Sequence, residues 1–153
     1  MGEMTSMQRT IAAISHVEAD RVPLFLLFGY RAAKEMRLSI KDYYADPANI
    51  VEAQLRLQKK YRTDCLFAFY YASLELEAMG GTSLFFHDGP PNAGSPIIKR
   101  VEDIPKLIQF APPSQNPVLQ NVLKAISMMK REVEDSIPII AVAISPFSMP
   151  VMQ

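Results

Sequence analysis

Three apolar runs without polar alternation constrain the fold of this chain more than any other feature. They occupy residues 24–28, 65–71 and 139–144. Continuous hydrophobicity over this length is typical of strands in parallel sheets, which are buried on both faces. The runs therefore predict three buried parallel strands, at about 23–28, 65–71 and 139–144.

Helical patterns separate these predicted strands. Thr5 and Gln8 have the spacing of a capping box before a helix expected at about 6–15. Asp46 and Pro47 form an N-cap and first helical position, and an apolar stripe with helical spacing follows them. Short helices are expected at about 73–79 and after residue 101, and a long one at 116–134. Residues 29–45 are expected to be irregular or briefly helical.

A dense turn signal at residues 88–94 joins two short β-like pieces, 82–87 and 95–100. We expect a hairpin-like excursion outside the main sheet. Helical connections between buried strands predict an α/β fold with a parallel sheet.

Composition narrows the range of partners. The 153 residues are 49% hydrophobic, and 16 basic residues balance 16 acidic ones. This balance gives no excess of positive charge that would favour binding to nucleic acid or an anionic membrane surface. No apolar run reaches the ~20 residues of a membrane span. A small molecule or a protein is the expected partner. A polar N-terminus and the single Cys65 predict a cytoplasmic protein without internal disulfides.

A set of short motifs carries a family resemblance. In order, they lie at 5–14, 18–23, 61–64, 77–81, 88–91, 101–104 and 145–148. Their sequence and spacing resemble the start of the uroporphyrinogen decarboxylase superfamily, especially its cobalamin-dependent methyltransferase branch. The resemblance covers nearly the whole chain.

The resemblance implies a TIM (β/α)8 barrel, which typically needs about 250 residues. We therefore expect residues 1–153 to be a partial barrel domain, truncated at its C-terminal end. It would contain three parallel strands, covering helices and the hairpin-like excursion. Because three strands cannot close a barrel, their exposed edges predict a homo-oligomer.

The family resemblance implies two chemistries: decarboxylation of uroporphyrinogen, or methyl transfer between a corrinoid and a thiol or similar acceptor. Decarboxylases of the family have an arginine-rich motif after the first strand, where this chain has Phe28 and one arginine, Arg31. They also have an aspartate near the end of the second strand, where this chain has Tyr71. Both differences favour methyl transfer, with a decarboxylase-like carboxy-lyase as the alternative. A non-catalytic, self-associating module is the third hypothesis.

In the methyltransferase branch, the resemblance implies zinc that activates the acceptor thiol, together with a corrinoid or corrinoid-protein partner. The implied zinc ligands are a His-x-Cys pair and a distant Cys, none of which this chain contains. Cys65, His16 and His87 lack ligand spacing. We therefore expect no metal or cofactor to be bound by this chain, and the isolated chain to be inactive.

Four residues are candidates for substrate binding, and no catalytic residue is assigned. Arg31 follows the first predicted strand, Tyr70 and Tyr71 end the second, and Ser145 ends the third. Ligands of α/β folds bind at these carboxyl ends. The alternatives are a surface salt bridge for Arg31, packing for the tyrosines and a helix-starting turn for Ser145. His87 beside Asp88 has the pattern of an oriented base, but a loop hydrogen bond is favoured.

Overall fold

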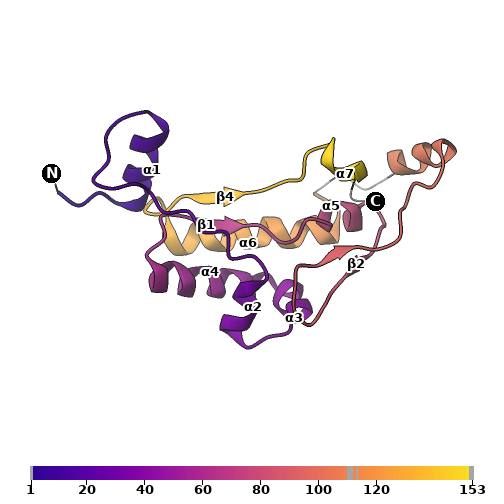
Figure 1. Cartoon of the computed structure of the whole chain (residues 1–153), viewed down its shortest axis with the longest axis horizontal. Coiled ribbons are helices and arrows are strands. Elements are labelled where there is room, and N and C mark those ends of the chain that lie inside the picture. Colours follow the sequence, from indigo (N-terminus) through magenta and orange to yellow (C-terminus); the bar gives the residue numbers. More distant parts are fainter. Residues whose placement is uncertain (1, 110–111, 113, 152–153) are drawn as a thin grey trace.

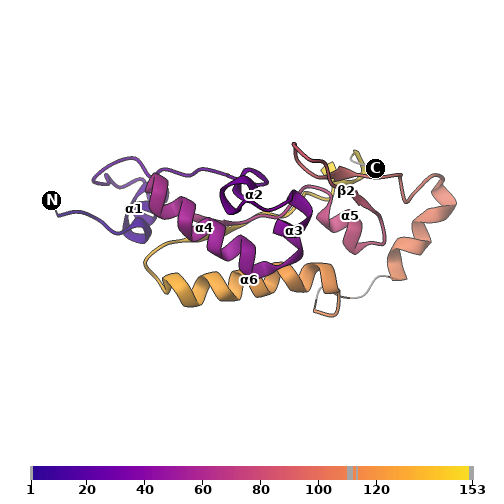
Figure 2. The same cartoon turned by 90° about the horizontal axis from the view of Figure 1, so that it is seen from below.

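The computed structural model describes residues 2–109, 112 and 114–151. Its centre is a layer of two helices, α4 (Pro47–Tyr61) and α6 (Pro117–Val133), which pack against each other and against strand β1 (Leu66–Ala68). Helix α6 also contacts strand β4 (Ile139–Ala141). Figures 1 and 2 show these elements running along the length of an elongated molecule.

Local capping explains where the helices begin. In helix α1 (Ser6–Ile14), the Thr5 side chain accepts from the Gln8 N–H, and the Gln8 side chain accepts in return from the Thr5 N–H. Asp46 caps α4 and Asn116 caps α6. Each cap satisfies backbone donors that have no partner within the helix. The helices predicted at 6–15 and 116–134 are confirmed within one residue at each end, and the helix predicted to start at Pro47 begins there.

The parallel sheet has two strands among the described residues. Strands β1 and β4 pair in parallel, with Leu66 opposite Ile139 and Ala68 opposite Ala141. The long connection between them includes α6, as expected for parallel strands. The second and third predicted strands are thus confirmed, although both are shorter than expected.

The predicted first strand, residues 23–28, is wrong as a buried strand. This segment is extended and begins beside β1, where the Asp64 N–H donates to the Leu24 carbonyl at 2.8 Å. It is not paired with any other described strand, and the side chains from Leu24 to Leu27 are 37–55% exposed. Strand β4 is likewise half-buried to exposed. Burial on both faces requires a second packing layer, which the described residues do not supply over these segments.

Shorter elements surround this centre. Helices α2 (Arg31–Met36) and α3 (Ile40–Ala45) follow the extended segment, and α5 (Leu74–Ala78) follows β1. Strands β2 (Ser83–Leu84) and β3 (Asn92–Ala93) form the antiparallel hairpin. Its second strand begins earlier than the predicted 95–100. A 3-10 helix, η1 (Val101–Gln109), and a terminal helix, α7 (Ser148–Val151), complete the order.

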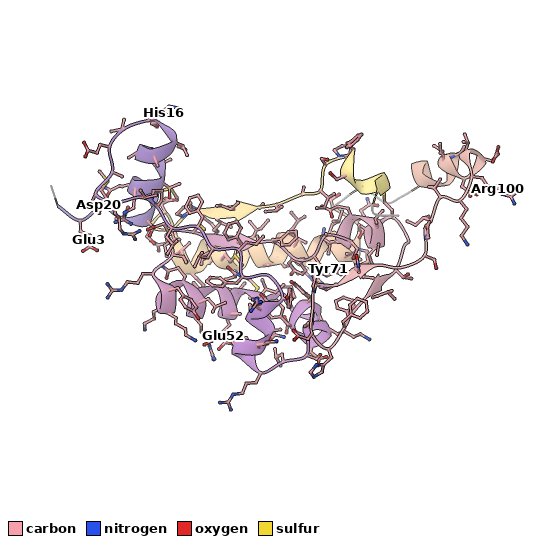
Figure 3. All side chains as sticks on the ribbon, viewed as in Figure 1. Glu3, His16, Asp20, Glu52, Tyr71 and Arg100 are labelled. Atoms are coloured by element: carbon pink, nitrogen blue, oxygen red, sulfur yellow. The ribbon has the colours of Figure 1, made fainter. Side chains whose placement is uncertain are left out.

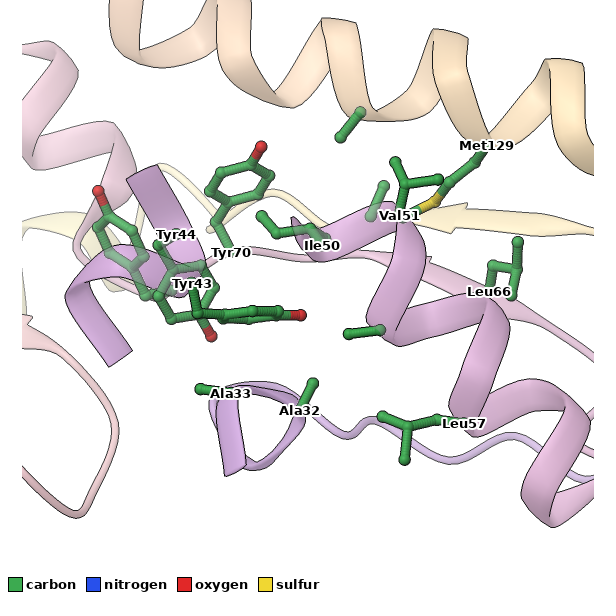
Figure 4. Packing of buried hydrophobic residues seen from close by; sticks show 14 of the residues in the cluster. Ala32, Ala33, Tyr43, Tyr44, Ile50, Val51, Leu57, Leu66, Tyr70 and Met129 are labelled. Carbon is green, nitrogen blue, oxygen red and sulfur yellow. The ribbon is translucent and has the colours of Figure 1, made fainter. Parts of the chain in front are cut away.

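The hydrophobic core lies between α2, α3, α4, α6 and β1. Ile50, Leu66 and Met129 are fully buried there, and Figure 4 shows them spread along this core, with Met129 reaching down from α6. Buried Tyr43 and Tyr44 extend the core toward the carboxyl end of β1. Within the described part of the chain, no helix combines the length and apolar character needed to cross a bilayer.

Candidate functional site

Two tyrosines follow β1 at its carboxyl end, and both are buried. The Tyr70 hydroxyl donates to the Asn121 carbonyl of α6 at 2.9 Å, and the Tyr71 hydroxyl donates to Glu77 Oε2 of α5 at 2.9 Å. Burial raises the pKa of both phenols well above the usual value, so each hydroxyl remains protonated and donates. These hydroxyls therefore fix the strand end to two helices.

Tyr44 of α3 joins the two rings into an aromatic cluster. Its ring centroid lies 5.7 Å from that of Tyr70 and 5.1 Å from that of Tyr71, in an edge-to-face arrangement with the latter. The Phe85 ring packs edge-to-face on Tyr71 at 5.4 Å. Figure 4 shows Tyr44 and Tyr70 side by side, with the Tyr70 hydroxyl directed toward α6. Such contacts hold the rings in defined positions.

Arg31 reaches this cluster through a tight turn. Gly29 has a φ of +50°, a conformation that glycine adopts at little cost, and the Arg31 N–H donates to the Phe28 carbonyl at 3.1 Å. The turn leads directly into α2, whose first residue is Arg31. Arg31 is thereby placed at an exposed helix start next to the aromatic cluster.

These groups line a cavity of about 260 Å³. Its wall is apolar and aromatic, and Arg31 is the single charged residue among the described lining residues. The wall contains Leu27, Phe28, Gly29, Tyr30, Arg31, Tyr44, Phe69, Tyr70, Tyr71, Ala72, Pro90 and Pro91. The cavity therefore combines three of the four predicted binding residues, and it suits a ligand with an apolar body and one anionic group.

Ser145 lies apart from this cavity. Its hydroxyl accepts from the Ser148 N–H at 3.1 Å and donates to the Ser148 hydroxyl at 3.0 Å, which makes it a cap for α7. It is absent from the described cavity lining. These contacts match the alternative interpretation of Ser145, a turn that starts a helix.

The hairpin contributes to the cavity through Pro90 and the buried Pro91. Next to them, Asp88 pairs with Lys34 Nζ of α2 at 2.8 Å. This pair connects the hairpin turn to the helix that carries Arg31. His87 is exposed in the same turn.

A buried ionic network occupies the opposite end of the strands. Asp64, fully buried, accepts from Ser6 Oγ, Arg9 Nη1, Arg21 Nη1 and Nη2, and the Leu24 N–H, at 2.5–3.0 Å. Arg9 also binds both carboxylate oxygens of Asp20. Figure 3 shows Asp20 and Tyr71 far apart along the molecule. At the amino end of parallel strands, such a network serves stability.

The sequence interpretation missed several of these residues. Tyr44 and Phe85 belonged to no motif. Pro91 lay in the motif at 88–91, but that motif gave no sign that Pro91 would reach the end of β1, because only tertiary contacts bring it there. The network had a signal, since residues 18–23 and 61–64 are motifs of the family resemblance and contain two of its carboxylates, Asp20 and Asp64. A shared partner for these carboxylates, Arg9, could not be assigned from spacing.

Metal ligands do not assemble in the described part of the chain. No group of three His, Cys, Asp or Glu side chains there could hold a metal ion. Cys65 is buried in the core, and burial raises the pKa of its thiol to about 11. The residues present therefore do not fit the zinc site implied by the family resemblance.

The fold and the cavity define an α/β protein whose candidate ligand site lies at the carboxyl end of β1, one of its two parallel strands. Residues 5–152 match the model of the family Uroporphyrinogen decarboxylase (URO-D), and the chain belongs to this family.

One sequence relative and one solved structure are similar to this chain, and the structure supports the fold. A uroporphyrinogen decarboxylase from Xylella fastidiosa is 26% identical over 153 residues, which cover 95% of this chain and 42% of the relative. A methyltransferase from Methanosarcina mazei superposes with a TM-score of 0.74 at 19% identity, over 96% of this chain and 44% of that one. The chain thus spans less than half the length of the relatives it matches.

Proposed function

We propose that this chain forms the N-terminal part of a URO-D-family methyltransferase. It would move a methyl group between methylcobalamin and a thiol or similar small acceptor. The observation that carries the proposal is the cavity beside Arg31, which has an apolar wall, one cation and no carboxylate among its described lining residues. An acidic porphyrinogen requires several cations, and its pyrrole N–H groups require an anionic acceptor.

In this proposal, the chain's own residues bind and position the acceptor. The rings of Tyr44, Tyr70 and Tyr71 exclude water from the apolar part of the substrate, and Arg31 fixes its anionic end. Orientation of this kind lowers the entropic part of the activation barrier. Because the described residues do not fit a zinc site, no step is assigned to a metal bound by this chain.

Decarboxylation remains the second candidate function, because the curated relative is a uroporphyrinogen decarboxylase. Under this alternative, the eight-stranded fold of the family would be shared, but the cavity would need cations from residues outside those that line it here. Among the described residues that line the cavity, only Arg31 supplies a cation.

A direct comparison of the two reactions tests the proposal. The native protein that contains this chain is supplied either with methylcobalamin and a thiol or with uroporphyrinogen. We expect loss of methylcobalamin absorbance with formation of the thioether, no porphyrinogen decarboxylation, and at least a tenfold loss of kcat/KM in R31Q. Decarboxylation without methyl transfer would overturn the proposal in favour of the alternative.

Self-association is a further part of the proposed behaviour, and it also underlies the third hypothesis of a non-catalytic module. The observation in its favour is the exposed apolar segment, in which Phe25 is 40% and Leu27 55% exposed. Sedimentation of the 153-residue chain tests it: we expect a dimer or larger species that dissociates in L27D. A monomer at all concentrations would remove it.

A further inference from the structure

The hairpin turn carries an acidic group beside the cavity that is proposed to bind substrate. Asp88 lies in the turn between β2 and β3, two residues before Pro90, which lines the cavity. Its carboxylate faces α2, where Lys34 Nζ lies 2.8 Å from Oδ1. The turn, through Pro90, and the start of α2, through Arg31, therefore both line the cavity, and the Lys34–Asp88 pair lies outside its described lining.

Two cations of α2 lie on the same helical face. Arg31 and Lys34 are three residues apart, a spacing that places side chains next to each other. The pKa of Asp88 is held below its usual range, mainly by the hydrogen bond from Lys34 and further by the charges of Lys34, His87 and Arg31. The Asp88 carboxylate thus provides the negative charge opposite these cations in the ligand-free protein.

The ion pair between Lys34 and Asp88 is exposed. The two side chains are 59% and 63% exposed, and pairs of this kind contribute little because water competes for both charges. The cavity wall is mostly apolar, and Tyr70, Tyr71 and Pro91 in it are buried. A ligand anion with an apolar body gains contacts there that the Asp88 side chain does not make.

We propose that the cavity takes a small organic anion, whose charged group pairs with Arg31 and Lys34 in place of Asp88 while its apolar body contacts the tyrosines. Asp88 is then a competing internal anion, and the hairpin is released from α2 when the ligand binds. The inference uses the proposed function only to locate the substrate site. It adds Lys34 as a partner of the ligand anion and a role for the hairpin.

The test measures binding of three probes to the 153-residue chain by protein NMR titration. Benzoate has the charge and the apolar body, benzamide has the same body without charge, and acetate has the charge without the ring. We expect benzoate to bind at least tenfold more tightly than either, with shifts at the ring resonances of Tyr70 and Tyr71. In R31Q, the preference for benzoate over benzamide should fall to less than threefold.

Asp88 is tested by D88N, which keeps the size of the side chain and removes its charge. Benzoate binding should tighten about two- to fivefold, the range expected for loss of an exposed competing ion pair, and benzamide binding should not change. The matched control is D135N, which makes the same change in the exposed Lys130–Asp135 pair outside the cavity and should leave both affinities unchanged. Circular dichroism confirms that each variant is folded.

Each other outcome overturns a stated part of the inference. Equal affinities for benzoate and benzamide, or no binding of any probe, would exclude an anion site in this cavity. Weaker benzoate binding in D88N would show that Asp88 supports the ligand instead of competing with it. Because none of these measurements requires turnover, anion binding without methyl transfer would contradict the proposed function alone.

Discussion

The Arg9 guanidinium donates to the Asp64 carboxylate at 2.5 Å across 55 residues of sequence, and both side chains are almost completely buried, with 4% and 0% exposed. Helix α1 is thereby joined to Asp64, which lies two residues before β1. Since Asp64 also binds Arg21 and the Leu24 N–H, one carboxylate holds the N-terminal helix, the following loop and the extended segment together.

Removal of this carboxylate is expected to destabilise the fold strongly. D64A leaves the buried Arg9 with Asp20 as its remaining carboxylate partner and the Leu24 N–H without its side-chain acceptor. Breaking a buried pair from one side costs about 3–5 kcal/mol, and we expect about 3 because Asp20 remains. Urea unfolding measures this loss. E52Q, in the exposed Glu52–Arg56 pair, is the control and should cost less than about 0.5 kcal/mol.

Stability should also fall in acid. Burial alone would raise the pKa of Asp64, but hydrogen bonds from Leu24, Arg21, Ser6 and Arg9 outweigh it and lower that pKa, and Arg9 lowers the pKa of Asp20. Carboxylates with a lowered folded-state pKa stabilise the fold above their unfolded pKa, about 3.9, and this contribution disappears as the pH falls further.

We therefore expect the free energy of unfolding to decline as the pH is lowered from about 5 toward 3. The decline should be smaller in D20N, which has no carboxylate to protonate at that position. Urea unfolding at a series of pH values measures both slopes. Identical slopes in the two proteins would contradict the assignment to Asp20.

The Cys65 thiol is expected to be unreactive in the folded protein. Its side chain is buried and its pKa is raised to about 11, so little thiolate forms near neutral pH. Modification by a disulfide reagent such as DTNB at pH 8 should be slow and should accelerate when urea unfolds the chain. Rapid modification without urea, at a rate independent of stability, would show that the thiol is accessible.

Gly81 is expected to tolerate no side chain. A Cβ there would lie 2.8 Å from the Leu76 carbonyl oxygen and 3.0 Å from the Ile97 side chain. Because one obstacle is backbone, relief requires movement of the end of α5, and G81A should lose about 1–3 kcal/mol in urea unfolding. G2A is the control, since a Cβ at Gly2 meets nothing within 4 Å. Equal stability of the two variants would exclude this close approach.

The helices were predictable because their signals are local. Thr5 with Gln8 and Asp46 with Pro47 lie within a few residues of the backbone groups that they cap, and the apolar residues of α6 recur at helical spacing. The structure of residues 23–28 could not be predicted in this way. An apolar run indicates a tendency to be buried, but it does not supply the atoms that bury it. Leu27 is 55% exposed for this reason.

The candidate site was predictable in part. The order of strands and helices placed Arg31, Tyr70 and Tyr71 at strand ends, and the structure brings all three to one cavity. Ser145 had the same type of position, but its hydroxyl caps α7 instead. A position at a strand end does not determine where a side chain points, since the next element in the chain competes for its hydrogen bonds.

The sequence by itself determined the helices, the two paired strands and the family of this protein, because caps, apolar periodicity and ordered motifs are properties of neighbouring residues. The tertiary structure alone decided that Arg9 meets Asp64, that Tyr44 joins Tyr70 and Tyr71, and that Asp88 reaches Lys34. These contacts join segments far apart in the chain. Their geometry depends on how whole elements pack, which no local pattern encodes.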